Sequence, residues 1–335
     1  MNNNLILIST ILALSLSGVG CNKSGKLAQH STFTQPSGPV ELKLKWPKGE
    51  RITQDMDMKQ TAELSVPGRP VPIKQDITLE QEYGLTVLDE TPDGGHEVEM
   101  EILSARVGVT IGGMTLPNYD SAKKSTADKA NPVAKLFGKI IGSKVQFFLN
   151  ASNGVERIEG ADALAEMLAS GGRADQLEDL KNLYSEGNLK QMMSANLFMP
   201  PKAVQPGDTW PVHIEFPMGA LSTMVVDDHF TFQNWEMQGE RNCARLEFQG
   251  TITNKPDTNA NPNRMSVSIT NGEVSGVSWF DPGLGITIDT TMNLNLNMVI
   301  TVPMHGRGNL GAAVRMQNIT DQMNQTITMK LISVK

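Results

Sequence analysis

The chain has 335 residues and a formal net charge of -7, with 29 Lys and Arg residues against 36 Asp and Glu residues. This acidic balance argues against a nucleic-acid partner, which would require clustered positive charge. Residues 40–335 are enough for one large domain or two ordinary domains with hydrophobic cores, and we expect a single β-rich domain there.

The N-terminus has the pattern of an export signal. Residues 5–16 are nearly all apolar, and they are too few to span a membrane, which needs about 20 residues. Small residues at positions 17–20 then precede Cys21. The pattern predicts a signal peptide over residues 1–20, although positions 1–4 contain no Lys or Arg. The alternative, an N-terminal apolar helix of the fold, is disfavoured because no amphipathic period is visible.

Cys21 resembles the cysteine of a bacterial lipobox, whose thiol receives diacylglycerol and becomes the mature N-terminus. The resemblance implies that Cys21 is a lipid attachment site and that the membrane is a partner of the chain. The match is partial, because Gly18 stands where a lipobox has Leu. Gly18 and Gly20 also fit an ordinary cleavage site, so simple secretion remains the alternative. Residues 21–39 contain little apolar material and predict a flexible tether.

Period-two alternation of apolar residues, typical of half-buried strands, dominates from position 40 onward. Before position 112 it predicts strands with these inward residues: Val40, Leu42, Leu44 and Trp46; Ile52, Met56, Met58, Ala62, Leu64 and Val66; Ile77, Leu79, Tyr83, Leu85 and Val87; and Val98, Met100 and Ile102 followed by Leu103, Ala105, Val107, Val109 and Ile111. The change of phase near Ile102 predicts a β-bulge. Turn residues at Pro92–Gly95, Ser152–Gly154 and Asp281–Gly285 predict antiparallel connections.

A central helical insert is predicted at about residues 120–195. Residues 120–141 have helical character, and residues 161–195 suggest two helices separated by Gly171 and Gly172. The second of these has Leu177, Leu180, Leu183 and Tyr184 at helical spacing.

Strands resume after the insert. The clearest alternation runs from Ile286 to Val302, which predicts one strand of about 55 Å at about 3.3 Å per residue. Other apolar runs that continue the pattern are Met224, Val226, Phe230 and Phe232; Ala244, Leu246, Phe248 and Ile252; Met265, Val267 and Ile269, then a second run with Val274, Val277 and Trp279; and Met323, Ile327, Met329 and Leu331. Strands this long must twist and curl. The fold class is therefore α+β, mainly antiparallel β, with long curved strands in an open barrel or curled sheet.

Residues that could carry chemistry are scattered. Asp227 and His229 share one strand face and Asp228 has the other, without a third metal ligand in sight, so a solvated face is the favoured interpretation. Glu97, Glu99 and Glu101 form an acidic stripe that we expect to face solvent. Gly306–Gly311 contains a G-x-G but lacks a nucleotide-binding context.

Cys243, the only other cysteine, is interpreted as a small buried or half-buried residue. No cofactor, metal site or catalytic residue is predicted, and we expect that the protein is not an enzyme.

Methionine is frequent, at 19 residues. Several fall on the predicted apolar faces: Met56, Met58, Met100, Met224, Met292, Met298, Met323 and Met329. Methionine is flexible and polarisable, so these side chains either fill a core or line an adaptable pocket.

Two short motifs resemble an uncharacterised family of bacterial exported lipoproteins. One is the pattern P-x-x-x-V-x-x-G-D-x-W from Pro200 to Trp210, and the other is Phe280-Asp281-Pro282 before the long strand. Physically, Pro, Gly and Asp build a turn there, and Trp210 packs as the next strand starts. More distantly, long curved strands with a helical cover resemble the open β-barrel of LolA- and LolB-type lipoprotein carriers, a likeness of fold only.

These observations predict an exported bacterial protein anchored to a membrane, at the periplasmic or outer-membrane face. Two functions remain open. One is a binding module that holds a lipid or another apolar ligand in the curled sheet. The other is a structural or protein-interaction module of the cell envelope without a small ligand. A pocket lined by the even-numbered residues of Ile286–Val302 would favour binding, and Leu294 and Leu296 would then contact the ligand.

Overall fold

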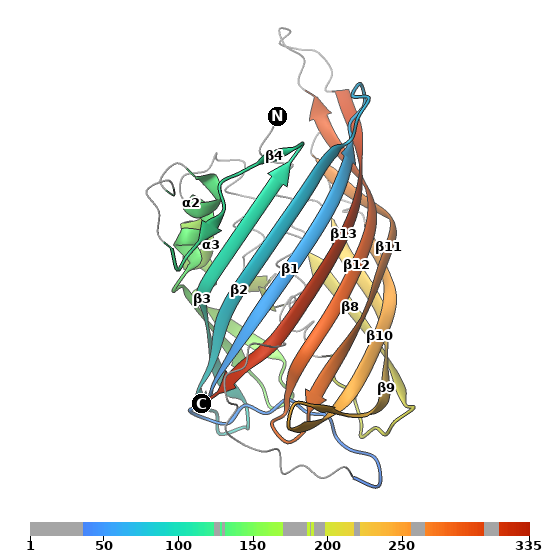
Figure 1. Ribbon diagram of the computed structural model, residues 1–335. Helices are drawn as coiled ribbons and strands as arrows, with labels where there is room; N and C mark the ends of the chain where they lie inside the picture. Colours follow the sequence, from blue (N-terminus) through green and yellow to red (C-terminus); the bar gives the residue numbers. More distant parts are fainter. Residues whose placement is uncertain are drawn as a thin grey trace.

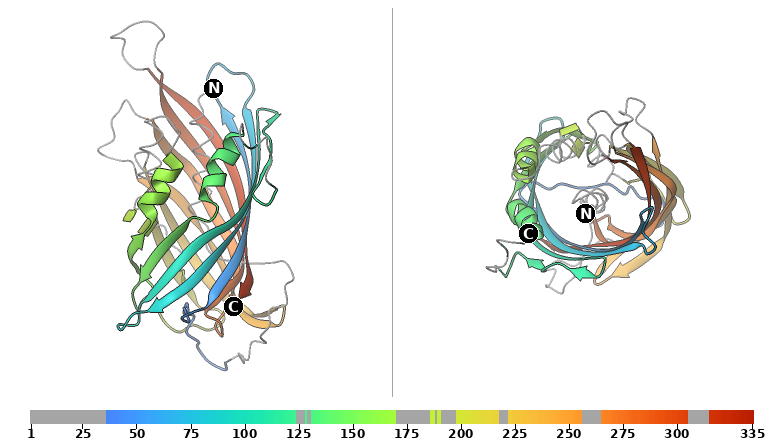
Figure 2. Two further views of the ribbon diagram at one scale, coloured as in Figure 1. Left: turned by 90° about the vertical axis from the view of Figure 1, so that its left-hand side faces the viewer. Right: turned by 90° about the horizontal axis from the view of Figure 1, so that it is seen from above.

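The computed structural model describes residues 36–123, 128, 131–169, 186–187, 189–190, 198–217, 222–255, 265–304 and 315–335. Their strands form one antiparallel sheet of 13 strands, in the order β7-β6-β3-β2-β1-β13-β12-β11-β10-β9-β8, with β4 and β5 paired to β3 (Figure 1). The sheet curls until it encloses an interior, as the view from above shows (Figure 2). Within the described residues no ladder joins the end strands β7 and β8, so the sheet is curled but not closed.

The elements have the following bounds. The strands are β1 Arg51–Ser65, β2 Ile73–Glu90, β3 His96–Ile111, β4 Met114–Thr115, β5 Tyr119–Asp120, β6 Lys144–Leu149, β7 Val155–Glu159, β8 Thr209–Pro217, β9 Thr223–Gln238, β10 Arg241–Lys255, β11 Ser266–Asp281, β12 Ile286–Met304 and β13 Arg315–Val334. The helices are α2 Pro132–Ile140 and α3 Ala161–Ala169.

The long strand predicted at Ile286–Val302 is confirmed as β12, which has 19 residues. Its even-numbered residues face the interior, where Leu294 and Leu296 are buried, and Asn293, Asn295 and Asn297 are exposed on the other side. The same alternation along β1, β2 and β13 gives the curled sheet a mostly apolar inner face and a polar outer face. The predicted fold class, mainly antiparallel β with long curved strands and a helical insert, is confirmed.

The β-bulge predicted near Ile102 is also confirmed. Glu82 pairs with Ser104 and the next residue, Tyr83, pairs with Ile102, so Leu103 is the extra residue on β3. A second register shift corrects the prediction for β11. The two runs expected there are one strand, with a shift between Ile269 and Asn271 that changes which side chains face inward.

The insert is less helical than predicted. Between the two helices lies the antiparallel hairpin of β6 and β7, which extends the sheet beyond β3. Helix α2 begins after Asn131, whose side-chain Oδ1 accepts a hydrogen bond from Val133 N at 3.0 Å, and Pro132 fits the first turn. Helix α2 packs against β3 and α3 packs against α2, and both helices stand at the rim of the ring seen from above (Figure 2). The helix predicted around Leu177 lies outside the described residues.

Residues 40–46, predicted as a strand, do not join the sheet. Their backbone makes one isolated bridge, between Val40 and Val204, and Lys45 N donates to Gly285 O at 3.0 Å. We call this segment the end strap, because it crosses one end of the curled sheet (Figure 1). Its alternation arises because Leu42 is buried and Leu44 and Trp46 are half-buried, whereas Glu41, Lys43 and Lys45 face solvent.

Candidate ligand cavity

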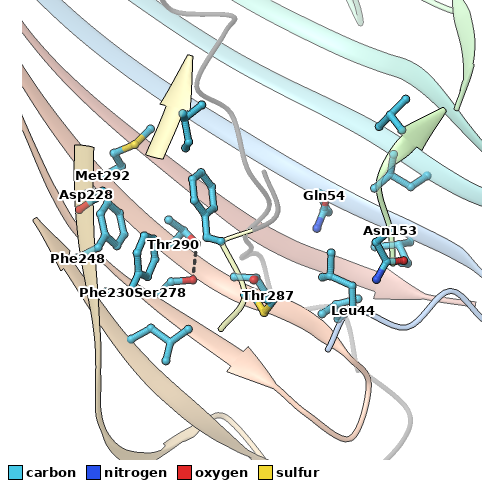
Figure 3. Close-up of a pocket in the computed structure, with 18 of the residues that line it drawn as sticks. Leu44, Gln54, Asn153, Asp228, Phe230, Phe248, Ser278, Thr287, Thr290 and Met292 are labelled. Carbon is cyan, nitrogen blue, oxygen red and sulfur yellow. Dashed lines mark hydrogen bonds between the residues drawn. The ribbon is translucent and has the colours of Figure 1, made fainter. Parts of the chain in front are cut away.

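A cavity of about 150 Å³ lies inside the curled sheet beside the end strap (Figure 3). Its walls come from strands that are far apart in the sequence, and from three segments outside the strands. The lining residues are Leu44, Trp46, Ile52, Gln54, Leu85, Val98, Phe147, Leu149, Asn153, Val155, Phe198, Met199, Ile214, Val226, Asp228, Phe230, Leu246, Phe248, Val274, Ser278, Ile286, Thr287, Thr290 and Met292. A cavity needs about 10–15 Å³ by this measure to hold one water, so this one has room for roughly ten non-hydrogen atoms.

Stacked aromatic rings form one wall of the cavity. The ring of Phe230 lies 5.4 Å from that of Phe198, 5.8 Å from that of Trp210 and 4.9 Å from that of Phe248. Gly276 on β11 makes room for Phe248, because a Cβ there would lie 2.3 Å from Phe248 Cζ and 2.3 Å from Thr291 O. Aromatic stacking gives this wall a fixed shape.

The end strap closes the cavity at the end where β12 begins. Trp46, which lines the cavity, donates from Nε1 to Asn153 Oδ1 at 2.9 Å. Lys45 Nζ donates to the carbonyls of Pro282 at 2.7 Å and Gly283 at 3.1 Å. The strap is thus fastened to the β6–β7 turn and to the turn before β12, two regions far apart in the chain.

Few polar groups face the cavity, and they differ in whether they have hydrogen-bond partners. Ser278 and Thr290 share a hydrogen bond of 2.9 Å between their hydroxyls. Gln54 is fully buried, and neither its Oε1 nor its Nε2 has a hydrogen-bond partner. Asp228 is 4% exposed and accepts a hydrogen bond from His229 N at 2.8 Å. Burial raises the pKa of the Asp228 carboxyl to about 6. The cavity lining includes no Lys, Arg or His among the described residues.

A second set of buried polar side chains lies on the inner face of β1, β2 and β13, outside the cavity lining. Gln325 Nε2 donates to Gln60 Oε1 at 3.1 Å, and Gln75 and Asp321 are buried on the same three strands. One polar atom of each of these four side chains has no partner: Gln60 Nε2, Gln75 Oε1, Asp321 Oδ1 and Gln325 Oε1. Burial without a partner raises the pKa of the Asp321 carboxyl to about 6.

The sequence-predicted site residues have varied outcomes. Cys21, the predicted lipid attachment site, lies outside the described residues, as does Gly306–Gly311. Asp227 and His229 are exposed on the outer face of β9, as predicted for a solvated strand face. Asp227 Oδ1 lies 2.7 Å from His213 Nδ1, and this partner raises the pKa of the His213 imidazole. Within the described ranges, no three His, Cys, Asp or Glu side chains converge on a metal position.

The acidic stripe on β3 is half-buried and partly paired, rather than fully solvent-facing. Glu99 Oε1 lies 2.7 Å from Lys144 Nζ, and Glu101 Oε2 lies 2.8 Å from Arg51 Nη2. Cys243 is fully buried, as predicted, and burial raises the pKa of its thiol to about 12. A thiol with this pKa is unreactive at neutral pH.

Most of the methionines on the predicted apolar faces fill the core, and Met292 lines the cavity. Leu294 and Leu296 are 0% and 1% exposed and do not line it. The sequence-based expectation that these two leucines line the pocket is not met for this cavity, which ends one inward position earlier on β12, at Met292.

The turn that precedes Trp210 is built as predicted. Asp208 Oδ2 accepts from Gln205 N at 2.9 Å, and Gly207 has a φ of 97°, which favours glycine. Trp210 is buried at the start of β8 and donates from Nε1 to Phe198 O at 3.0 Å. This bond links the motif to Phe198, which lines the cavity, although no residue of the motif lines it.

Sequence reasoning missed the buried glutamines. Along β1 the inward positions are Ile52, Gln54, Met56, Met58, Gln60, Ala62 and Leu64. Gln54 and Gln60 interrupt an otherwise apolar series, as Gln75 and Gln81 do on β2 and Asp321 and Gln325 on β13. The signal that could have found them is a polar residue at a position where the alternation of the strand places apolar residues.

Residues 93–302 match the model of a family of unknown function, DUF6263. The chain belongs to this family. No curated protein matches the chain. Among the described residues, none of the helices combines the length and the apolar character needed to cross a membrane.

Three solved structures are similar to the chain in fold only. Lipovitellin, described in terms of lipid–protein interactions, is 10% identical with a TM-score of 0.43, and the match covers 87% of this chain and 26% of that one. A putative exported protein with a YmcC-like fold from Bacteroides fragilis is 9% identical, with coverages of 88% and 100% and a TM-score of 0.24. An outer membrane channel from Pseudomonas putida F1 is 8% identical, with coverages of 90% and 100% and a TM-score of 0.24.

Proposed function

We propose that this member of the family is an exported bacterial envelope protein that binds an apolar ligand, such as a lipid or an acyl chain, in the cavity of its curled sheet. The observation that carries the proposal is the cavity itself. Small-molecule sites are concave and mostly apolar, with a few placed polar groups. The cavity matches this description, with an aromatic wall, aliphatic side chains from most of the sheet and a handful of polar residues.

The alternative is a structural or protein-interaction module without a small ligand. It requires that inward side chains fill the interior to native density. They do so around Leu294 and Leu296, but not beside the end strap, where the cavity remains. The cavity therefore favours binding over a purely structural role. We also propose that this role is binding rather than catalysis, and that lipid on Cys21 anchors the chain to a membrane.

The test is a titration with N-phenyl-1-naphthylamine, whose fluorescence rises in apolar surroundings. The Cys21→Ser chain is used so that no detergent competes for the cavity. We expect saturable binding with one site per chain, abolished by Met292→Trp, which fills the cavity. Asn295→Trp is the matched control, because Asn295 lies on the outer face of the same strand. No saturable binding, or equal loss in both variants, would support the structural alternative.

A further inference from the structure

The cavity contains one fully buried side chain whose hydrogen-bonding capacity is entirely unused. Gln54 on β1 is 0% exposed, and both Oε1 and Nε2 are without partners. In Figure 3 it lies on the side of the cavity with Leu44 and Asn153, across from Phe248 and Met292. Leaving a buried amide unsatisfied costs free energy that an apolar side chain of the same size would not cost. A ligand that pairs with the amide recovers this cost.

The chemistry around Gln54 restricts the ligand's polar group. A carboxamide offers one acceptor and one donor group, so it is best matched by a group that both donates and accepts. None of the described residues lining the cavity carries a positive charge, and Asp228 is the one carboxyl among them. A buried anion would therefore lack a counter-charge and would lie in the same cavity as an acidic residue. An uncharged group fits this environment.

Resting on the proposed function, we propose that the ligand is a single-chain amphiphile whose uncharged head group, a hydroxyl or a protonated acid, hydrogen-bonds to the Gln54 carboxamide. Its chain lies against the aromatic wall of Phe230 and Phe248. The volume limits the enclosed part of the molecule to roughly ten non-hydrogen atoms, at about 10–15 Å³ for each water-sized volume. A longer molecule would have to extend beyond the cavity.

The test compares how one substitution affects an alcohol and the matching alkane. The Kd values of 1-octanol and n-octane are measured by their displacement of N-phenyl-1-naphthylamine from the wild-type protein and from the variant Gln54→Met. The substitution removes both polar atoms of the carboxamide and leaves a side chain of similar volume. We expect the Kd for octanol to rise roughly tenfold, as loss of a hydrogen bond to a buried group implies. The Kd for octane stays the same or falls, because the alkane never pairs with the amide.

Gln81→Met is the matched control, since Gln81 is a buried glutamine of the neighbouring strand that does not line the cavity. It should change neither Kd, and thermal unfolding reports whether each variant is folded. Equal effects of Gln54→Met on octanol and octane would overturn the assignment of the head group while leaving apolar binding intact. Tighter binding of octanoate than of octanol at pH 8 would overturn the uncharged head group. If neither probe binds to the wild-type protein, the proposed function itself fails.

Discussion

Trp46 Nε1 donates a hydrogen bond to Asn153 Oδ1 at 2.9 Å and so ties the end strap to the turn between β6 and β7. The two residues are 107 positions apart in the chain, and both line the cavity. Asn153 has a φ of 63°, the left-handed region that asparagine and glycine tolerate best. Asn153 thus both occupies the left-handed position of the turn and holds Trp46 at the closed end of the cavity.

This relationship predicts different outcomes for two small substitutions. Asn153→Gly keeps the backbone conformation but leaves the Trp46 indole N–H without its acceptor, which should cost about 1–2 kcal/mol of unfolding free energy. Asn153→Ala loses the same bond and adds backbone strain of about 1 kcal/mol. Denaturant unfolding measures both values. A glycine variant less stable than the alanine variant would contradict this account of the turn.

The buried ion pair between Arg241 and Asp281 predicts a large stability effect. Arg241 Nη1 lies 2.9 Å from Asp281 Oδ2, and the side chains are 6% and 0% exposed. Asp281 Oδ1 also accepts from Gly283 N at 2.7 Å, which shapes the turn before β12. Asp281→Asn keeps the turn bond but leaves the guanidinium buried without its counter-charge, so we expect a loss of about 3–5 kcal/mol.

Removing the charge of Arg241 as well should restore part of that stability. The double variant Arg241→Met, Asp281→Asn no longer buries the charge of Arg241, and we expect it to unfold at a higher denaturant concentration than Asp281→Asn alone. A double variant that is less stable than the single one would show that the pair contributes mainly through other contacts of Arg241.

Asp321 predicts a pH dependence of stability. Burial raises the pKa of its carboxyl from 3.8 to about 6, so the folded state binds this proton more tightly than the unfolded state. The contribution of Asp321 to stability therefore falls as the pH rises from about 4 to about 6, and stays low above that. Asp321→Asn removes the ionisable group, and its stability relative to wild type should rise by up to about 3 kcal/mol across this window.

The matched control is Asp57→Asn, because Asp57 is exposed on the outer face of β1. Unfolding free energies measured from pH 4 to pH 8 should show a growing advantage for Asp321→Asn and no such growth for Asp57→Asn. A constant difference between Asp321→Asn and wild type over this range would contradict a raised pKa.

The lipid anchor proposed at Cys21 predicts that a substitution there changes the compartment of the protein. Cys21→Ser removes the thiol that would carry diacylglycerol, and two acyl chains are what stable anchoring requires. Fractionation should then place the variant in the soluble fraction, whereas Cys243→Ala, at the buried cysteine, should remain with the membrane. An unmodified N-terminal Cys21 in the wild-type protein, or a disulfide between Cys21 and Cys243, would contradict the proposal.

The strands could be predicted because the alternation of apolar and polar residues within each strand shows which of its faces is buried. In β12 the alternation of Leu294 and Leu296 with Asn293 and Asn295 depends only on neighbouring residues. The end strap shows the limit of this signal. Leu42, Leu44 and Trp46 alternate in the same way because they also face the interior, although their backbone pairs with loops instead of a strand.

The cavity could not be predicted, because it depends on residues that the curl of the sheet brings together. Ile52 on β1, Phe147 on β6 and Phe248 on β10 line the same space, and no local pattern places them side by side. Gln54 was overlooked for a related reason. A lone glutamine in a strand suggests solvent, and only the burial of its neighbours shows that it points inward.

The claim that the curled sheet binds an apolar ligand is tested most directly by native mass spectrometry of the protein taken from its own membrane. The account predicts a chain that begins at Cys21 with covalent diacylglycerol and carries one additional noncovalent apolar molecule. Met292→Trp should lose the noncovalent molecule and keep the covalent one. The account would be contradicted by a wild-type protein that carries no noncovalent molecule. Its mass would then differ from that of Met292→Trp only by the difference between the methionine and tryptophan side chains.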